Sequence, residues 1–293
     1  MSTLALSSPL VSTQWLADHL GSDTLVVLDA TVLVVKAADG RQRWLSGHDE
    51  YLIGGHVPGA VFADLLEVFS DPDGDFGFAR PSAELFERAA ASVGIDNHTR
   101  VVVYDSSVGQ WAARIWWLFR SFGYDNVAVL DGGLTKWRAE ARPSATGHVT
   151  PSTSVGFTAA PRAELWVDKA FVESIVAGDT DAALVCSAPP AEFSGEASSR
   201  TRPGHIPGSV SLPAGRLVDR ATNAFLRDEA LRARVAPAAG SAARVVTYCG
   251  AGIAAAASAL ALTLAGHDAV AIYDGSLNEW AADESAPLAV TAP

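Results

Sequence analysis

The chain repeats itself. Three short motifs occur twice in the same order, at separations of 149, 144 and 143 residues. The pairs are residues 55–59 and 204–208 (Gly-His-x-Pro-Gly), 100–104 and 244–248 (Arg-Val-Val-x-Tyr), and 131–137 and 274–280 (Asp-Gly-x-Leu-x-x-Trp). Chance agreement of three motifs in one order is improbable, so we interpret the 293 residues as a tandem duplication of one folding unit.

Each half alternates strand patterns with helix patterns. In the first half we expect strands at residues 25–29, 100–104 and 127–130, and helices at 12–20, 82–92 and 111–122. The second half follows the same order, with strands at 183–187 and 245–248 and a helix capped by Asp168. The stretch from residue 30 to Tyr51 reads as irregular, and residues 70–77 read as loop. These patterns predict the α/β class, with two tandem domains, each a mostly parallel sheet with helices on both faces.

The join between the halves is marked by composition. Residues 146–161 are rich in Ser, Thr, Pro and Gly and carry almost no charge, which is typical of a linker. We therefore expect a first domain at residues 1–145, a linker at 146–161 and a second domain at 162–293. Two domains also suit a chain of this length.

Cys249 lies where the second half passes from a strand to a helix. Residues 245–248 form a short β-rich run, and residues 254–265 consist almost wholly of helix formers, closed by Gly266. This order places the sulfur at the carboxyl edge of a parallel sheet, where ligands usually bind. Backbone N–H groups at a helix N-terminus stabilise an anion, so the position favours a reactive thiolate.

Only the second half has a nucleophile at this place, because Asp105 occupies the corresponding position in the first half. We interpret the first half as a scaffold that forms one wall of a cleft between the domains. For the other cysteine, Cys186, we weigh buried packing at a strand end against resolution of an oxidised Cys249, and packing is favoured. His56 and His205 recur in both halves, which favours a structural role in the repeated turn over a catalytic one.

Bulk properties exclude several classes of protein. The formal net charge is −12, whereas nucleic-acid binding needs a basic surface, so no nucleic-acid partner is expected. Two cysteines make neither a disulfide framework nor a metal cluster. The first ten residues lack a basic segment before an apolar core, and no apolar run reaches the length of a membrane span, so we expect a cytoplasmic protein without a membrane partner.

Together these motifs resemble the rhodanese superfamily, and specifically its tandem-domain sulfurtransferases. The resemblance covers nearly the whole chain and rests on the two Gly-His-x-Pro-Gly segments, the single Cys249 loop and the paired Asp-Gly-x-Leu-x-x-Trp endings. It implies transfer of sulfane sulfur from 3-mercaptopyruvate or thiosulfate to a thiophilic acceptor, through a persulfide on Cys249. Neither a metal nor an organic cofactor is implied. The acceptor would be a thiol or cyanide, or a thioredoxin-like protein.

The resemblance also implies a set of site residues. Cys249 would be the nucleophile, and Asp64, which follows the first Gly-His-x-Pro-Gly, matches a carboxylate proposed to act in catalysis in the mercaptopyruvate branch. The small anionic donor would be held by the loop and by an arginine upstream of the second Gly-His-x-Pro-Gly. These substrate-binding candidates are Gly250, Ala251, Gly252, Ile253, Ala254 and either Arg200 or Arg202.

The loop resembles the mercaptopyruvate branch more than the thiosulfate branch, since no cationic side chain follows Cys249. It also departs from the family. Ala251 and Ala254 stand where that branch has hydroxyl side chains, so a Cys–Ser–Asp relay cannot operate as proposed there. Glu192 stands where the family has a substrate-binding arginine, and a glutamate would repel an anionic ligand.

Two other functions are open to such a chain. A phosphatase of the same fold would need Cys-x₅-Arg, but no arginine follows Cys249 at that spacing, and this alternative is poor. A sulfur-carrier or regulatory module with weak turnover of small donors is the main alternative, and it is motivated by Glu192, Ala251 and Ala254.

Overall fold

Two five-stranded sheets with the same strand order form the framework of the protein. A computed structural model describes residues 6–36, 42–153, 155–198, 200–240 and 242–291. Every pairing within the two sheets is parallel. The first sheet has the order β1 (Leu10–Val11), β7 (Val127–Leu130), β6 (Arg100–Tyr104), β2 (Leu25–Asp29), β5 (Val61–Phe62). Read from its matching edge, the second has the order β8 (Trp166–Val167), β12 (Val270–Tyr273), β11 (Val245–Tyr248), β9 (Ala183–Cys186), β10 (Val210–Ser211).

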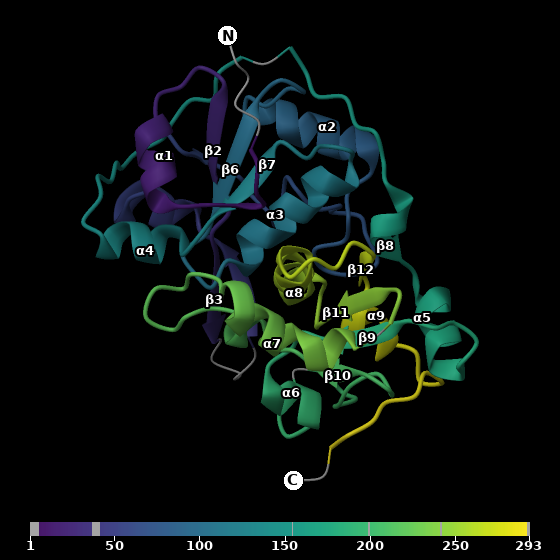
Figure 1. Ribbon diagram of the computed structural model, residues 1–293. Coiled ribbons are helices and arrows are strands. Elements are labelled where there is room, and N and C mark those ends of the chain that lie inside the picture. The colour runs from purple at the N-terminus through teal and green to yellow at the C-terminus, as the bar shows by residue number, and fades with distance from the viewer. Residues whose placement is uncertain (1–5, 37–41, 154, 199, 241, 292–293) are drawn as a thin grey trace.

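Helices cover both faces of each sheet (Figure 1). The outer face of the first sheet packs on α1 (Thr13–His19) and α4 (Gly133–Ala139), and that of the second on α5 (Lys169–Ala177) and α9 (Ser276–Trp280). The inner faces carry α2 (Ala83–Ser92) and α3 (Gln110–Ser121) in the first half, and α7 (Asp228–Ala239) and α8 (Ile253–Leu264) in the second. The remaining short helices are η1 (Glu50–Gly54), η2 (Ala163–Leu165), α6 (Pro190–Ser194) and η3 (Ala214–Arg216). The expected fold class is confirmed.

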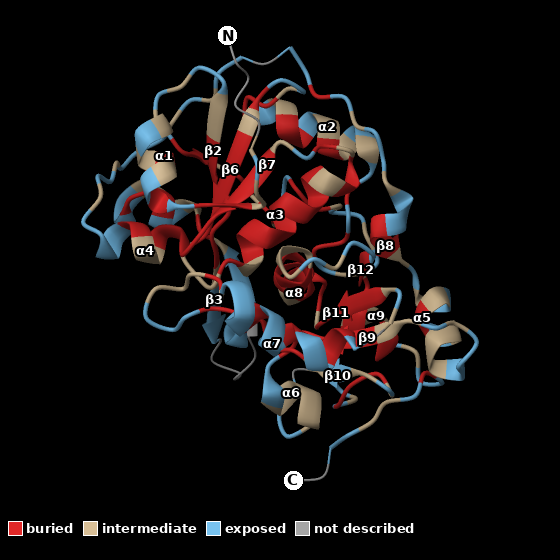
Figure 2. Ribbon diagram, in the orientation of Figure 1, coloured by how far each residue is buried: buried red, intermediate tan, exposed pale blue. Residues whose placement is uncertain are grey.

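The two halves share one apolar core. Buried residues of α3 and α8, which pack against each other, belong to a single cluster that also contains the inner faces of both sheets (Figure 2). Bulky tryptophans of α3, among them Trp116 and Trp117, belong to this cluster together with the small alanines of α8. Large side chains beside small ones fill an interface at native density. The cleft between the halves is therefore held between rigidly packed elements.

The two aspartates of the repeated Asp-Gly-x-Leu motifs join the halves. Asp131 accepts hydrogen bonds from Phe225 N at 2.8 Å and from the Arg227 side chain at 2.7 Å, both in the second half. Asp274 pairs with the buried Arg114 of α3 at 2.7 Å and accepts a hydrogen bond from Arg80 N, both in the first half. The sequence repeat thus places one carboxylate on each side of the interface, each bound by the opposite half.

The repeated Gly-His-x-Pro-Gly turns are structural, as expected. Nδ1 of His205 lies 2.8 Å from Phe193 O, and Nδ1 of His56 lies 2.9 Å from Tyr51 O. The last residue of the neighbouring strand also holds each turn. Tyr248 Oη accepts a hydrogen bond from Ile206 N, and in the first half Tyr104 Oη accepts one from Val57 N. These bonds fix the turns to the strand ends next to the cleft.

The stretch that joins the halves runs along the first half. Phe157 packs edge-on against Phe86 of α2, and Ala160 N donates to Phe122 O. Thr158 N donates to the side chain of Asn97 at 2.7 Å. The described part of residues 146–161 therefore packs against the first half and is not a free linker between the two halves.

The prediction that residues 30–51 are irregular is wrong. An antiparallel hairpin forms from β3 (Val32–Lys36) and β4 (Gln42–Ser46), followed by η1. Val34 and Trp44 are direct cross-strand partners, so their side chains lie on the same face of the hairpin. The β-branched run at residues 32–35 carries the strand signal, but its alternation is masked because apolar residues occupy both faces. Both Val34 and Trp44 reach the site described next.

Candidate functional site

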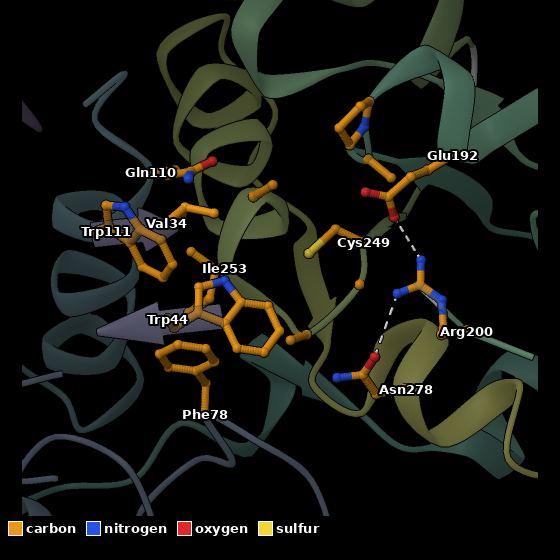
Figure 3. A pocket seen from close by; sticks show the side chains of 15 residues that line it. Val34, Trp44, Phe78, Gln110, Trp111, Glu192, Arg200, Cys249, Ile253 and Asn278 are labelled. Atoms are coloured by element: carbon orange, nitrogen blue, oxygen red, sulfur yellow. Dashed lines mark hydrogen bonds and ion pairs between the residues drawn. The ribbon is translucent and has the colours of Figure 1, made fainter. Parts of the chain in front are cut away.

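Cys249 opens onto a cavity of about 160 Å³ between the two halves. Its side chain is 4% exposed and lies at the centre of the cavity wall (Figure 3). The volume is small beside the roughly 300–1,000 Å³ of sites for drug-sized ligands. The first half contributes Val34, Trp44, Phe78, Gln110 and Trp111, and the second Ala188, Pro189, Glu192, Arg200, Cys249, Gly250, Ala251, Ile253, Ala254 and Asn278. The expected cleft between the halves is present and holds the thiol.

The loop that carries Cys249 is held by the first turn of α9. Ser276 Oγ accepts hydrogen bonds from Cys249 N and Gly252 N, each at 3.1 Å, and donates to Tyr273 O at 2.9 Å. Ser276 adopts this place with a φ of 50°, in the left-handed region. Gly133 fills the same position of the repeated motif in the first half, so only the half that carries Cys249 has an anchoring hydroxyl there.

The orientation of the loop peptides follows from their carbonyl groups. Leu277 N donates to Cys249 O and Asn278 N donates to Gly250 O, both at 3.0 Å. In a planar trans peptide the N–H points opposite to the C=O, so the N–H groups of Gly250 and Ala251 point away from α9. Both residues line the cavity. The loop can therefore direct amide donors at an anion on Cys249, although the Gly252 amide is bound to Ser276.

One wall of the cavity carries an ion pair. Arg200 Nη2 lies 2.7 Å from Glu192 Oε2, and Arg200 Nη1 lies 3.5 Å from Asn278 Oδ1 (Figure 3). The two side chains are only 16% and 24% exposed. Glu192 thus lies beside Arg200, the arginine expected to bind an anion, and its carboxylate already binds one nitrogen of the guanidinium.

Three of the predicted site residues do not line this cavity, namely Gly252, Arg202 and Asp64. Arg202 donates to Asp283 O and Ala286 O, each at 2.5 Å, and fastens the C-terminal segment. Asp64 accepts hydrogen bonds from Leu66 N at 2.9 Å and from the Ser46 side chain at 3.1 Å. Neither Arg202 nor Asp64 lines the cavity in the described structure. Of the two arginines, Arg200 is the one that reaches the thiol's cavity, and the catalytic role of Asp64 stays a prediction.

An aromatic wall faces the ion pair across Cys249 (Figure 3). The rings of Trp44 and Phe78 lie 5.4 Å apart, edge to face, and those of Phe78 and Trp111 lie 5.5 Å apart. Trp44, from the hairpin, is 41% exposed at the mouth of the cavity. Sequence reasoning missed this wall. Its signal was the run of β-formers at residues 32–35 together with Trp44, nine residues after the end of that run.

Asp105 shows how the corresponding loop of the first half binds an acidic side chain. Its buried carboxylate accepts hydrogen bonds from the N–H groups of Ser107, Gly109, Trp111 and Ala112, at 2.8, 3.1, 2.9 and 3.0 Å. Burial raises the pKa of Asp105 above its ordinary value, although these four bonds oppose the shift. In this fold, the loop before the inner helix therefore directs several backbone N–H groups at one acceptor, which in the first half is the protein's own carboxyl group.

Cys186 lies at the end of β9 and is fully buried in the outer core of the second half. Burial raises the pKa of its thiol to about 12. The site therefore agrees with the packing role that we expected in preference to a resolving one.

Iodoacetamide at neutral pH should accordingly alkylate Cys249 and spare Cys186. A thiolate is the nucleophile in alkylation, and a thiol with so high a pKa is almost never ionised at pH 7. Peptide mass spectrometry of the native protein, with a fully unfolded sample as the control for reactivity, measures both sites. Equal labelling of the two cysteines in the native protein would contradict this assignment.

Comparison with known proteins agrees with the geometry. The model of the rhodanese-like domain matches residues 12–140 and 175–283. The chain is 31% identical to a thiosulfate/3-mercaptopyruvate sulfurtransferase 2 of Arabidopsis thaliana, over 97% of this chain and 87% of that one. It is 30% identical to the 3-mercaptopyruvate sulfurtransferase of Escherichia coli K12, over 95% and 96%. The crystal structure of SseA, a 3-mercaptopyruvate sulfotransferase from Escherichia coli, superposes with a TM-score of 0.79 at 29% identity, covering 92% of this chain and 99% of that one.

The fold and the thiol site define a sulfur-transfer enzyme built from two α/β units. The chain belongs to the rhodanese family. No helix in the part of the chain that the structure describes is long and apolar enough to cross a membrane.

Proposed function

We propose that the chain moves sulfane sulfur from 3-mercaptopyruvate, with thiosulfate as the second candidate donor, to a thiol or cyanide through a persulfide on Cys249. The observation that carries this is the place of the thiol, which lines the cavity between the halves on a loop whose Gly250 and Ala251 amides point away from α9. Neither of the two residues after Cys249 brings a side-chain charge that would suit the thiosulfate dianion.

The chemistry follows from this arrangement. The Cys249 thiolate attacks the transferable sulfur, which is the outer sulfur of thiosulfate or the thiol sulfur of 3-mercaptopyruvate. The bond from that sulfur to the rest of the donor then breaks, and its electron pair stays on the leaving group. The leaving group is sulfite when thiosulfate is the donor. It is the enolate of pyruvate when 3-mercaptopyruvate is the donor, and this enolate takes up a proton. The loop amides stabilise the charge on the outer sulfur, and Arg200 orients the anionic part of the donor. Asp64 is proposed to polarise the bound donor from the first half, where its hydrogen bond to Ser46 ties it to the end of the hairpin.

The domain limits are part of the proposal. We place a non-catalytic domain at residues 1–145, a linker at 146–161 and the catalytic domain at 162–293, and the two matched family segments support this division. A cytoplasmic location and a thioredoxin-like protein as a physiological acceptor are proposed with it. The division of labour between the halves rests on Asp105 and Cys249, which occupy equivalent loops.

Intact-mass and peptide mass spectrometry after exposure to each donor test the proposal. We expect Cys249 to gain about 32 Da, one sulfur atom, and to lose it when cyanide is added. Steady-state rates with the two donors then rank them, with 3-mercaptopyruvate expected to have the higher kcat/KM. Added sulfur on Cys186 instead of Cys249 would refute the mechanism.

A sulfur-carrier module is the second candidate, and the Glu192–Arg200 pair favours it, because this pair opposes binding of small anionic donors. That function would show itself as a Cys249 persulfide acquired from a partner protein's persulfide, with neither small donor turned over.

A further inference from the structure

The wall formed by Glu192, Arg200 and Asn278 has no net charge, although it lies in the cavity of an enzyme whose donors are anions. Arg200 presents a guanidinium, and Glu192 already binds one edge of it at 2.7 Å. Both groups are largely shielded from water, at 16% and 24% exposure, so each depends on its charged partner.

A ligand with only negative charge can bind Arg200, but it fits this wall less well than a ligand that carries both charges. To reach Arg200 it must compete with the Glu192 carboxylate, and on binding it leaves two anions side by side at one guanidinium. Like charges in a partly desolvated site repel strongly. A ligand with only positive charge meets the converse problem at Arg200. Either ligand therefore opens the ion pair without replacing both halves of it.

A zwitterion replaces both. An α-carboxylate can take the guanidinium of Arg200 while the neighbouring α-ammonium takes the carboxylate of Glu192, so each charged group exchanges one partner for another. The cavity, of about 160 Å³, suits a molecule of amino-acid size. We propose that Glu192 and Arg200 together select a zwitterionic α-amino-acid thiol, of which cysteine is the simplest, as the acceptor of the Cys249 sulfur. This inference rests on the proposed function and specifies its acceptor.

The transfer step is balanced without any further reactant besides water. The outer sulfur of the Cys249 persulfide takes up a proton from water when it is anionic, and the acceptor thiolate then attacks this sulfur. A new S–S bond forms to the acceptor, and the S–S bond to Cys249 breaks with its electron pair remaining on Cys249 Sγ. The products are the acceptor persulfide and the Cys249 thiolate, which is ready for the next donor.

Single-turnover kinetics separate this acceptor step from donor binding. The protein is loaded with sulfur on Cys249, freed of donor and mixed with cysteine, with 3-mercaptopropionate (which lacks the ammonium) or with cysteamine (which lacks the carboxylate). Loss of the persulfide is followed by mass spectrometry, and every rate is divided by the rate with cyanide, which has neither group. Comparing variants for the same thiol removes differences in intrinsic thiol reactivity.

Glu192→Gln should lower the rate ratio of cysteine to 3-mercaptopropionate by on the order of tenfold, since a charge-assisted bond to the ammonium is lost. Arg200→Gln should lower the ratio of cysteine to cysteamine by a similar factor. Glu196→Gln, at an exposed glutamate four residues further along, is the matched control and should change neither ratio.

If Glu192→Gln leaves the ratio of cysteine to 3-mercaptopropionate unchanged while the loaded protein still gives its sulfur to cyanide, the zwitterion preference is overturned and sulfur transfer stands. If mass spectrometry shows that the protein acquires no sulfur on Cys249, both the zwitterion preference and the proposed sulfur transfer are overturned.

Discussion

Cys249→Ser should reduce sulfur transfer from either donor by about three orders of magnitude or more. A serine hydroxyl is not ionised near neutral pH and cannot hold a sulfane sulfur, so the covalent route is lost and the loop amides alone remain. Each factor of ten corresponds to about 1.4 kcal/mol of transition-state free energy. The assay measures sulfite or pyruvate released with cyanide as acceptor, together with the mass of the donor-treated protein.

The control for this variant is Cys186→Ala. Cys186 lies in the outer core and does not line the cavity, and its raised pKa keeps it a thiol, so its removal should leave the turnover rate within about twofold of the unmodified protein. Circular dichroism and melting curves verify that both variants are folded. Full transfer by Cys249→Ser would rule out Cys249 as the sulfur carrier, and loss of transfer in a folded Cys186→Ala protein would contradict the packing role of Cys186.

Local sequence patterns were enough to locate the thiol but not to complete its surroundings. The strand–glycine–helix pattern around Cys249 depends on neighbours within about ten residues, and the structure confirms strand, loop and helix there. The choice between Arg200 and Arg202 depended instead on contacts across the chain. Arg202 is bound by the backbone carbonyls of Asp283 and Ala286, more than eighty residues further on, and backbone acceptors leave no mark in a sequence.

The role of Ser276 could have been found from the sequence. Aligning the two halves sets Ser276 against Gly133 in otherwise similar motifs, and a difference confined to the half that carries the thiol points to the site. The aromatic wall was harder to predict, because Trp44 joins it through a hairpin whose first strand is apolar on both faces. The ion pair of Glu192 with Arg200 requires α6 to lie beside a later loop, which only the tertiary structure defines.

Asp105→Ala should lower the free energy of unfolding by roughly 3 kcal/mol, the largest stability effect that we expect from a single polar residue of the first half. Its carboxylate satisfies four buried backbone N–H groups at the start of α3, and alanine leaves all four without an acceptor. Asp105→Asn retains one carbonyl oxygen and should cost less. Asp75→Ala, in an exposed loop, is the control and should stay within about 0.5 kcal/mol. Urea denaturation at neutral pH measures all three.

The Asp105 carboxyl group makes the difference in unfolding free energy between the unmodified protein and Asp105→Ala depend on pH. Burial raises the pKa of Asp105, so the folded protein binds this proton more tightly than the unfolded chain does. Its contribution to stability is therefore complete below the ordinary carboxyl pKa and declines as the pH rises through the raised value. The advantage of the unmodified protein over Asp105→Ala should be larger at mildly acidic than at neutral pH. An advantage that instead grows toward neutral pH would contradict this prediction and would mean that the four backbone N–H groups stabilise the ionised carboxylate by more than burial destabilises it.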